Sequence, residues 1–273
     1  MSLRFSQTPR IVKLLLAFTL VVPLVIPVNY VLINPGEGTP LFPKMLTIAS
    51  PTIESSKSWK SYPANGQMYL LSIWVTNPES KIFGHQVLTC WAQRDCVVIP
   101  RSVVYEKNTD DKAEQAVGKK EMKQSQSAAL TATKGLFKKY YPNIDLTDLK
   151  DSHLKISLRN TGGPSGGLIF SLGISELLSP DDLLQGRKIA ATGTISAKGE
   201  VGAIGGVEEK IVAARKAKAE IIFISKENCS EIPDSVSGLG VIAVSTLDQA
   251  YKALREPKIS NFQGVQGCTN LDS

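Results

Sequence analysis

The stretch Gly-Gly-Pro-Ser-Gly-Gly-Leu-Ile-Phe-Ser-Leu, residues 162–172, places a serine among glycines and a proline, directly before an apolar run. A glycine-rich turn that opens a helix can cradle a phosphate, bend the chain or present a nucleophile. A P-loop would need a lysine and a hydroxyl residue after Gly167, where Leu168 and Ile169 stand. Neither this run nor a second one that ends at Gly205 and Gly206 has the G-x-G-x-x-G spacing of a dinucleotide site. We therefore expect no ATP, no NAD and no other cofactor.

The sequence around this turn indicates an α+β domain. Residues 154–158 alternate apolar and polar side chains like a half-buried strand, and residues 168–178 predict an apolar helix. A short second helix is expected from Ser179, because a capping residue, a proline and two acids follow one another. Further strands are expected at 189–195, 201–204, 221–224 and 241–244, and further helices at 208–218 and 246–254. Strands and helices mix without strict βαβ alternation, which is typical of α+β folds.

A serine nucleophile needs a base, and histidine is scarce in this chain. His85 and His153 are the two histidines, and neither lies in a catalytic motif. No H-E-x-x-H pattern or zinc-type cysteine spacing is present, so we expect no metal. A lysine can replace histidine if burial lowers the pKa of its ammonium group.

Lys210 has a suitable setting for such a base. It follows Gly205 and Gly206 in the first turn of a predicted helix, where a cation is normally disfavoured. Helical periodicity places it on the buried face with Val207, Ile211 and Ala214. A solvated surface lysine is the commoner alternative for any single lysine of this kind.

Three blocks of sequence surround these two residues. Residues 162–167 are G-G-P-S-G-G, residues 191–195 are A-T-G-T-I, and residues 199–210 are G-E-V-G-A-I-G-G-V-E-E-K. In this order and at these separations they resemble the proteolytic domain of Lon-type serine proteases, above all the membrane-anchored, ATPase-free Lon-like proteases of bacteria. The resemblance covers roughly residues 154–254. It implies the Lon proteolytic fold, a mixed sheet with packed helices.

The same resemblance implies roles for individual residues. Ser165 would be the nucleophile, Lys210 the general base, and Thr192 a supporting residue that orients the Lys210 amine. The backbone of the turn at Gly163, Pro164 and Gly166 would supply the oxyanion-binding N–H groups. By family analogy the chain would form a homo-oligomer, a hexameric ring. The few residues between Tyr140 and Leu154 leave no room for the PDZ domain that anchored relatives often carry there.

The N-terminal region predicts a membrane anchor. Arg4, Arg10 and Lys13 precede the uncharged residues 14–33, and about twenty apolar residues suffice for a transmembrane helix. Basic residues on its N-terminal side place that end in the cytoplasm and the rest of the chain outside the cell membrane. A cleaved signal peptide is the alternative, although no small-x-small cleavage site follows.

All four cysteines, Cys90, Cys96, Cys229 and Cys268, follow this segment. Outside the membrane disulfides are chemically permitted, and four cysteines allow three pairings. We favour Cys90–Cys96 together with Cys229–Cys268. Free buried thiols remain the alternative.

The chain's size and charge restrict the remaining possibilities. Its 273 residues, 42% of them hydrophobic, suffice for a sizeable core. The net charge is +6, but the basic residues are scattered, so we expect solvated faces and no nucleic-acid partner. The expected layout is a cytoplasmic basic segment (1–13), a transmembrane anchor (14–33), a linker (34–65), a membrane-proximal strand and helix region (66–150), the Lon-like proteolytic domain (151–256) and a C-terminal tail (257–273).

Together these features predict an ATP-independent, membrane-anchored serine endopeptidase with a Ser165–Lys210 dyad. Its substrates would be unfolded or flexible extracytoplasmic polypeptides. A hypothesis from another class is a catalytically silent, membrane-tethered binding or scaffold protein that keeps the protease fold.

Overall fold

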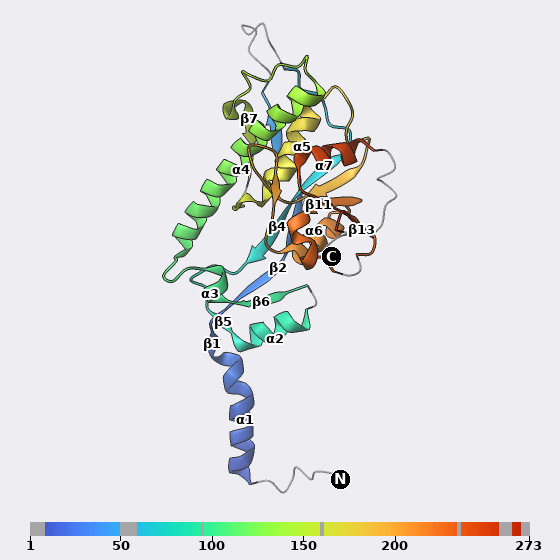
Figure 1. Cartoon of the computed structure of the whole chain (residues 1–273). Helices are drawn as coiled ribbons and strands as arrows, with labels where there is room; N and C mark the ends of the chain where they lie inside the picture. Colours follow the sequence, from blue (N-terminus) through green and yellow to red (C-terminus); the bar gives the residue numbers. More distant parts are fainter. Residues whose placement is uncertain are drawn as a thin grey trace, which may run out of the picture. The chain divides into compact units, whose positions relative to one another are not determined.

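The computed structural model describes residues 9–49, 59–93, 95–158, 161–233, 236–256 and 264–268. Most of the predicted basic segment and most of the predicted C-terminal tail lie outside these ranges. The chain divides into two compact units, which Figure 1 shows within one ribbon. Unit 1 comprises Met1–Asn34 and Trp74–Asp111, and unit 2 comprises Pro35–Ile73 and Lys112–Ser273.

Unit 1 is small and is built around two antiparallel strand pairs. Its elements are α1 (Arg10–Val25), β1 (Pro27–Val28), the first part of β2 (Tyr30–Pro40), β5 (Ile82–Phe83), α2 (Gly84–Ala92), β6 (Val97–Pro100) and α3 (Arg101–Val104). Strand β1 pairs with β5, and β2 pairs with β6. Leu32, Ile82, Val87 and Cys90 form its core. Cys90 is bonded to Cys96 across the turn between α2 and β6.

The predicted transmembrane helix over 14–33 is wrong. Helix α1 ends at Val25, and the segment from Tyr30 onward is strand β2. Pro27 explains the early end, because proline disfavours the helical conformation of the residue before it, and Ile26 is indeed extended. At 16 residues, α1 is about 24 Å long. Among the described residues, no helix has the length and apolar character needed to cross a membrane.

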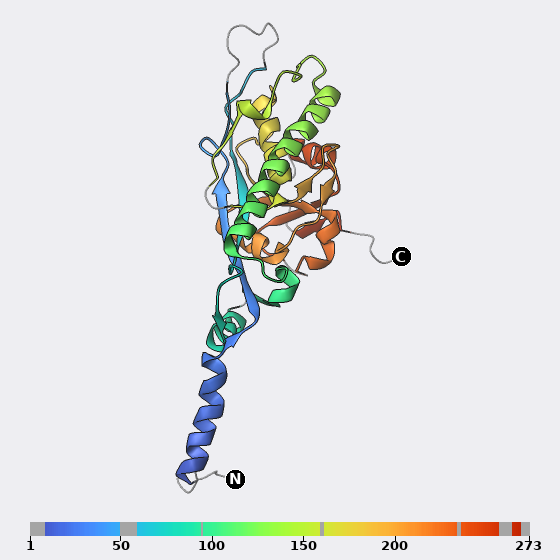
Figure 2. The ribbon, with the colours of Figure 1, turned by 90° about the vertical axis from the view of Figure 1, so that its left-hand side faces the viewer.

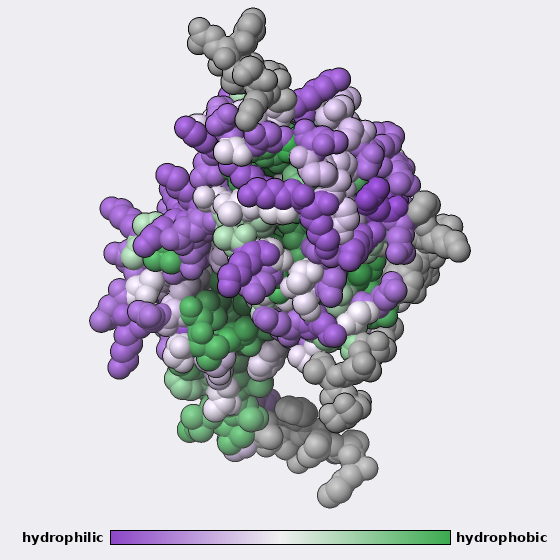
Figure 3. All heavy atoms as spheres, turned by 45° about the horizontal axis from the view of Figure 1, so that its top comes forward, coloured by the Kyte–Doolittle hydropathy of each residue, from purple (hydrophilic) through white to green (hydrophobic). Residues whose placement is uncertain are grey.

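Helix α1 nevertheless exposes apolar side chains on all sides. None of its residues is buried. Its exposed large side chains include Ile11, Leu14, Phe18 and Leu20. Apolar side chains, green in Figure 3, lie uncovered on the molecular surface. A helix that is apolar all round normally lies in an apolar environment.

Unit 2 holds the main sheet and the helices that cover it. Its strands are the remainder of β2, β3 (Leu46–Ile48), β4 (Gln67–Val75), β7 (Leu154–Ile156), β8 (Lys188–Ala191), β9 (Thr194–Ile195), β10 (Val201–Gly202), β11 (Ile221–Ser225), β12 (Gly240–Val244) and β13 (Gly264–Gln266). Its helices are α4 (Asp111–Tyr140), α5 (Gly167–Leu178), α6 (Val207–Lys216) and α7 (Leu247–Arg255), with short 3₁₀ helices η2 (Asp151–His153), η3 (Pro164–Gly166) and η4 (Lys226–Glu231). Residues 34–65, expected to be a linker, thus include most of β2 and all of β3.

The strand order in unit 2 is β13-β12-β11-β8-β4-β2, and the first five strands run parallel. Side chains of β11 alternate between two cores. Ile221 and Phe223 face the core shared with α4, α5 and α7, whereas Ile222 and Ile224 face the core shared with α6. Figure 2 shows these helices around the sheet. A mixed sheet with packed helices is therefore confirmed.

The segment after α5 differs from the prediction, since no helix begins at Ser179. The Ser179 hydroxyl accepts a hydrogen bond from Asp181 N, but the chain then follows an irregular path. Buried Arg187 donates to the carbonyl oxygens of Leu183 and Leu184 at 2.7 and 2.8 Å, and also bonds the carbonyl of Leu254. The Arg187 side chain thus engages carbonyls that a helix would use, and the helix that the capping pattern predicts does not form.

Candidate active site

Ser165 lies in η3, directly before the buried helix α5. Two backbone hydrogen bonds hold this turn against the segment after β8. Gly193 N donates to Ser165 O at 3.0 Å, and Leu168 N donates to Gly193 O at 3.1 Å. A Cβ atom on Gly167 would come within 2.8 Å of Ile195 N. Glycine is therefore required for the turn to approach the neighbouring strand so closely.

Helix α4 holds the other side of the same turn. Gly163 N donates to Gly118 O at 3.0 Å, and Ser125 Oγ donates to Pro164 O at 2.9 Å. A Cβ atom on Gly162 would lie 3.0 Å from the Gly118 Cα atom, so two glycines permit this contact. Sequence reasoning did not assign Gly118 or Ser125 to the site. The one available signal is a glycine within the helix now seen as α4, where glycine costs about 0.5–1 kcal/mol relative to alanine and so suggests a packing role.

These contacts bear on the predicted oxyanion donors. Gly163 N–H is engaged by Gly118 O in this conformation. Pro164 has no N–H and cannot donate. The positive end of the α5 dipole still lies at this turn, since α5 begins at Gly167. Any oxyanion site here therefore needs the N–H of another residue of the turn, or release of the Gly163 N–H from Gly118 O.

Thr192 lies beside the nucleophile turn, as expected from the order of the sequence blocks. It is 1% exposed, and its N–H donates to Phe223 O at 2.9 Å in the neighbouring strand. Its hydroxyl donates to Ser165 O at 3.4 Å. The structure thus brings Thr192 and Ser165 together through the Ser165 backbone.

Lys210 is a buried lysine in the first turns of α6. Gly206 caps this helix with a left-handed φ of 68°, and Lys210 N donates to Gly206 O at 3.0 Å. The side chain is 3% exposed, on the same face as buried Val207, Ile211 and Ala214. None of the ion pairs formed by the described residues includes Lys210.

Burial decides the protonation of Lys210. Desolvation lowers the pKa of its ammonium group to about 8, against an ordinary value of 10.5, while Glu209 and Glu231 act in the opposite direction. A substantial neutral fraction is therefore present slightly above neutral pH. Within the described residues no hydrogen bond joins Lys210 to Ser165 or Thr192 in this conformation.

The histidines and the remaining cysteines lie in structural settings. His85 Nδ1 is 3.0 Å from Leu24 O, and the His153 ring packs 4.9 Å from that of Trp59. Cys229 is bonded to Cys268, so both disulfides have the pairing favoured from the sequence. No group of three or more potential metal ligands occurs among the residues that the structure describes.

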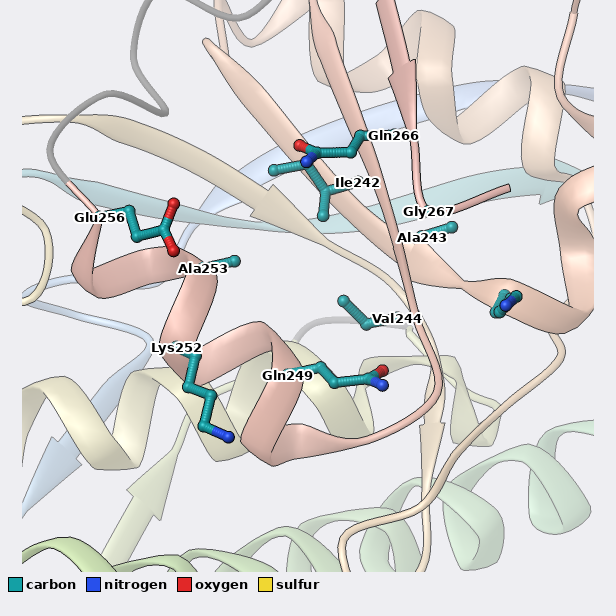
Figure 4. Close-up of a pocket in the computed structure, with 10 residues that line it drawn as sticks. Ile242, Ala243, Val244, Gln249, Lys252, Ala253, Glu256, Gln266 and Gly267 are labelled. Atoms are coloured by element: carbon teal, nitrogen blue, oxygen red, sulfur yellow. The ribbon is translucent and has the colours of Figure 1, made fainter. Parts of the chain in front are cut away.

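A separate hollow of roughly 560 Å³ lies between α7 and the strands β12 and β13. Figure 4 shows Gln249 and Lys252 of α7, and Glu256 directly after this helix, around it. Ser165, Thr192 and Lys210 do not line it. It therefore contributes nothing to the chemistry of the candidate dyad.

Residues 108–256 match the family described as the Lon protease (S16) C-terminal proteolytic domain. The chain belongs to this family. The match begins before α4, so the helix that contacts the nucleophile turn is part of the family domain.

Curated relatives agree with this assignment. The Lon protease of Haemophilus influenzae is 32% identical over 143 residues, which are 50% of this chain and 18% of the relative. The Lon protease of Vibrio parahaemolyticus is 32% identical over 141 residues, again 50% and 18%. The mitochondrial Lon protease homolog of Caenorhabditis elegans is 32% identical over 139 residues, 49% of this chain and 14% of the relative. The chain thus matches less than a fifth of each relative.

Replacing Lys210 with methionine should stabilise the fold. The lysine pKa is lower in the folded chain than in the unfolded one, so the unfolded state binds more protons between pH 8 and pH 10.5. The resulting penalty is fully present below about pH 8 and disappears as the pH rises toward 10.5. At pH 7 we expect Lys210→Met to unfold with a free energy about 1–3 kcal/mol higher than the parent.

Chemical denaturation at pH 7 and pH 10 measures this difference. Lys216→Met, an exposed position on the same helix, serves as the control and should change stability little. A Lys210→Met variant less stable than the parent at pH 7 would contradict a buried, unfavourable charge.

Proposed function

We propose that this chain is a serine endopeptidase in which Ser165 is the nucleophile and Lys210 the general base. The observation that carries the proposal is the buried Lys210 side chain, whose lowered pKa fits a base that works near neutral pH. The turn that presents Ser165 at the start of an apolar helix supports it. Membership of the Lon proteolytic family supports it independently.

The proposed reaction needs no histidine and no metal. Neutral Lys210 takes the proton of Ser165 Oγ as that oxygen attacks the scissile carbonyl carbon, and a tetrahedral oxyanion forms. When the C–N bond breaks, the Lys210 ammonium returns the proton to the leaving amine, and an acyl-serine ester remains. Water then attacks the ester with Lys210 again as base, which releases the carboxyl product and restores the Ser165 hydroxyl.

The N-terminus of α5 would stabilise the oxyanion, because backbone N–H groups and the helix dipole both favour negative charge there. Substrate binding would have to break the Gly163–Gly118 hydrogen bond if Gly163 contributes. Hydrogen bonds between catalytic groups are often absent in free enzymes and form with substrate. We propose the same for Ser165 and Lys210.

ATP independence and the choice of substrate are part of the proposal. No P-loop motif occurs in the 273 residues, so hydrolysis by this chain itself would not consume ATP. Extended or unfolded polypeptides are the expected substrates, since a glycine-lined turn admits an extended backbone.

The alternative is a silent scaffold that keeps the protease fold. It is favoured by one observation, the Gly163 N–H bound to Gly118 O, which leaves that expected oxyanion donor occupied. The presence of Ser165, Thr192 and a buried Lys210 together favours the hypothesis of an active protease.

Cleavage of casein or a fluorogenic peptide decides between the two. Ser165→Ala and Lys210→Met should each lower kcat/KM by about a thousand-fold or more. Exposed Ser237→Ala and Lys216→Met are the matched controls and should keep parental activity. Activity should rise with pH and level off above about 8, as Lys210 loses its proton. Undiminished cleavage by Ser165→Ala would exclude the proposal.

We also propose that the chain is attached to a membrane through α1 and works in an oxidising, extracytoplasmic compartment. The uncovered apolar side chains of α1 support attachment, and the two disulfides support the compartment.

Flotation with lipid vesicles tests the attachment. The full chain should float with vesicles, and Leu15→Glu combined with Phe18→Glu should abolish most of this binding, because both side chains are exposed on α1. Val265→Glu, an exposed apolar position in β13, is the control. Equal flotation of the α1 variant and the parent would exclude attachment through α1.

A further inference from the structure

The loop that leads into α6 is held by side chains of η4. Asn228 Oδ1 accepts a hydrogen bond from Ile204 N at 3.0 Å, and Asn228 Nδ2 donates to Ile204 O at 2.8 Å. One side chain thus satisfies both backbone groups of Ile204. Glu227 Oε2 accepts from Ala203 N at 2.9 Å. The backbone just before Gly205 and Gly206, where the helix that carries Lys210 begins, is therefore fixed from η4.

The same asparagine holds a carboxylate. Asn228 Nδ2 donates to Glu231 Oε1 at 2.6 Å. Asn228 is 1% exposed, so its amide is confined to these partners. Because η4 packs directly on α6, the Glu231 carboxylate is held near enough to act on the Lys210 ammonium group.

The 3₁₀ helix η4 is itself well anchored. The Ser225 hydroxyl caps its start by accepting from Glu227 N, and Cys229 is bonded to Cys268 beyond β13. Strand β11 leads directly into it. A fixed η4 can therefore transmit position to the α6 loop.

We propose that Asn228 is a positioning residue for Lys210: it fixes the Ile204 backbone ahead of α6 and holds Glu231 where its negative charge favours the protonated lysine. The inference rests on the proposed role of Lys210 as general base. It assigns to Asn228 and Glu231 the setting of that base, without contact of either residue with substrate.

The charges around Lys210 agree with this assignment. Burial lowers the Lys210 pKa, and the groups that raise it are Glu209 on α6 and Glu231 on η4. Glu209 is 4% exposed, and burial raises its own pKa, so its carboxylate is disfavoured in turn. Glu208 acts on Glu209, and Glu227 is not among the groups that shift the Lys210 pKa. Removing the Glu231 charge should thus lower the Lys210 pKa further.

A matched pair of variants separates charge from architecture. Glu231→Gln keeps an oxygen acceptor for Asn228 but removes the charge. Glu227→Gln keeps an acceptor for Ala203 N. It also removes a charge from η4, but this charge is not among those that shift the Lys210 pKa. The Lys210 titration can be followed by NMR of ¹³C-labelled lysine side chains, with the Lys210 signal identified by its loss in Lys210→Met.

In Glu231→Gln we expect Lys210 to titrate at lower pH, with a neutral fraction at pH 7 about two- to four-fold larger than in the parent. Glu227→Gln should titrate like the parent. An unchanged Lys210 titration in Glu231→Gln, or an equal shift in both variants, would overturn the role of Glu231. This readout needs no activity, so it stands or fails separately from the proposed protease function.

The role of Asn228 is tested by kinetics together with the same titration. Asn228→Ala should lower kcat about ten-fold or more with KM nearly unchanged, and should also move the Lys210 titration and the pH profile. A variant that folds, as judged by its thermal unfolding, but keeps the parental kcat and pH profile would overturn the positioning role. If Asn228→Ala does not fold, Asn228→Asp replaces it, since this substitution keeps the shape and removes the amide donor to Ile204 O and Glu231.

Discussion

The hydrogen-bonded contact between Gly193 and the turn that carries Ser165 is the constraint on which the rest of the candidate site depends. Gly193 N binds Ser165 O, and Gly193 O binds Leu168 N, so the first residues of α5 are fixed to the segment that continues β8. That segment belongs to the parallel sheet, through β8 and its neighbours β4 and β11. The position of Ser165 is thus set by the sheet, and glycine at position 167 permits the approach.

A second constraint is the burial of a lysine that gains no ion pair in return. An ammonium group in the interior that gains no ion pair costs stability, and the same desolvation lowers the pKa of the Lys210 amine. Stability of the fold and a neutral amine at position 210 therefore oppose each other, as is common at functional sites. Carboxylates near α6 moderate the cost by favouring the protonated form. The pKa of Lys210, the proposed base, is therefore set by a balance between desolvation and a few nearby charges.

Much of unit 2 could be predicted from its sequence. Strands β11 and β12 are short apolar runs because parallel strands are covered on both faces, and α5 is largely apolar because all its residues are buried. Lys210 could be selected from periodicity and helix position, and Ser165 and Thr192 from their blocks of sequence. The contact of Gly118 with Gly162 could not be predicted, since it joins residues far apart in sequence that have no distinguishing chemistry.

The predicted span and the predicted helix at Ser179 were wrong for a similar reason: in each case another residue outweighed a local sequence pattern. Residues 14–33 have the length and composition of a membrane span, but Pro27 ends the helix and β6 pairs with the residues after it. The capping pattern at Ser179 was sound, but Arg187 engages the carbonyls that a helix there would have used. Pro27 lies within the predicted span itself, whereas the hydrogen bonds of Arg187 depend on the burial of its side chain.

The most direct test of the central claim is the pH dependence of covalent labelling by a serine-directed phosphonate probe, mapped by mass spectrometry. The account predicts an adduct on Ser165 whose rate of formation rises with pH and levels off above about 8, and its loss in Lys210→Met. Labelling of Ser165 at the same rate in the parent and in Lys210→Met, or no adduct on Ser165 at any pH, would contradict it.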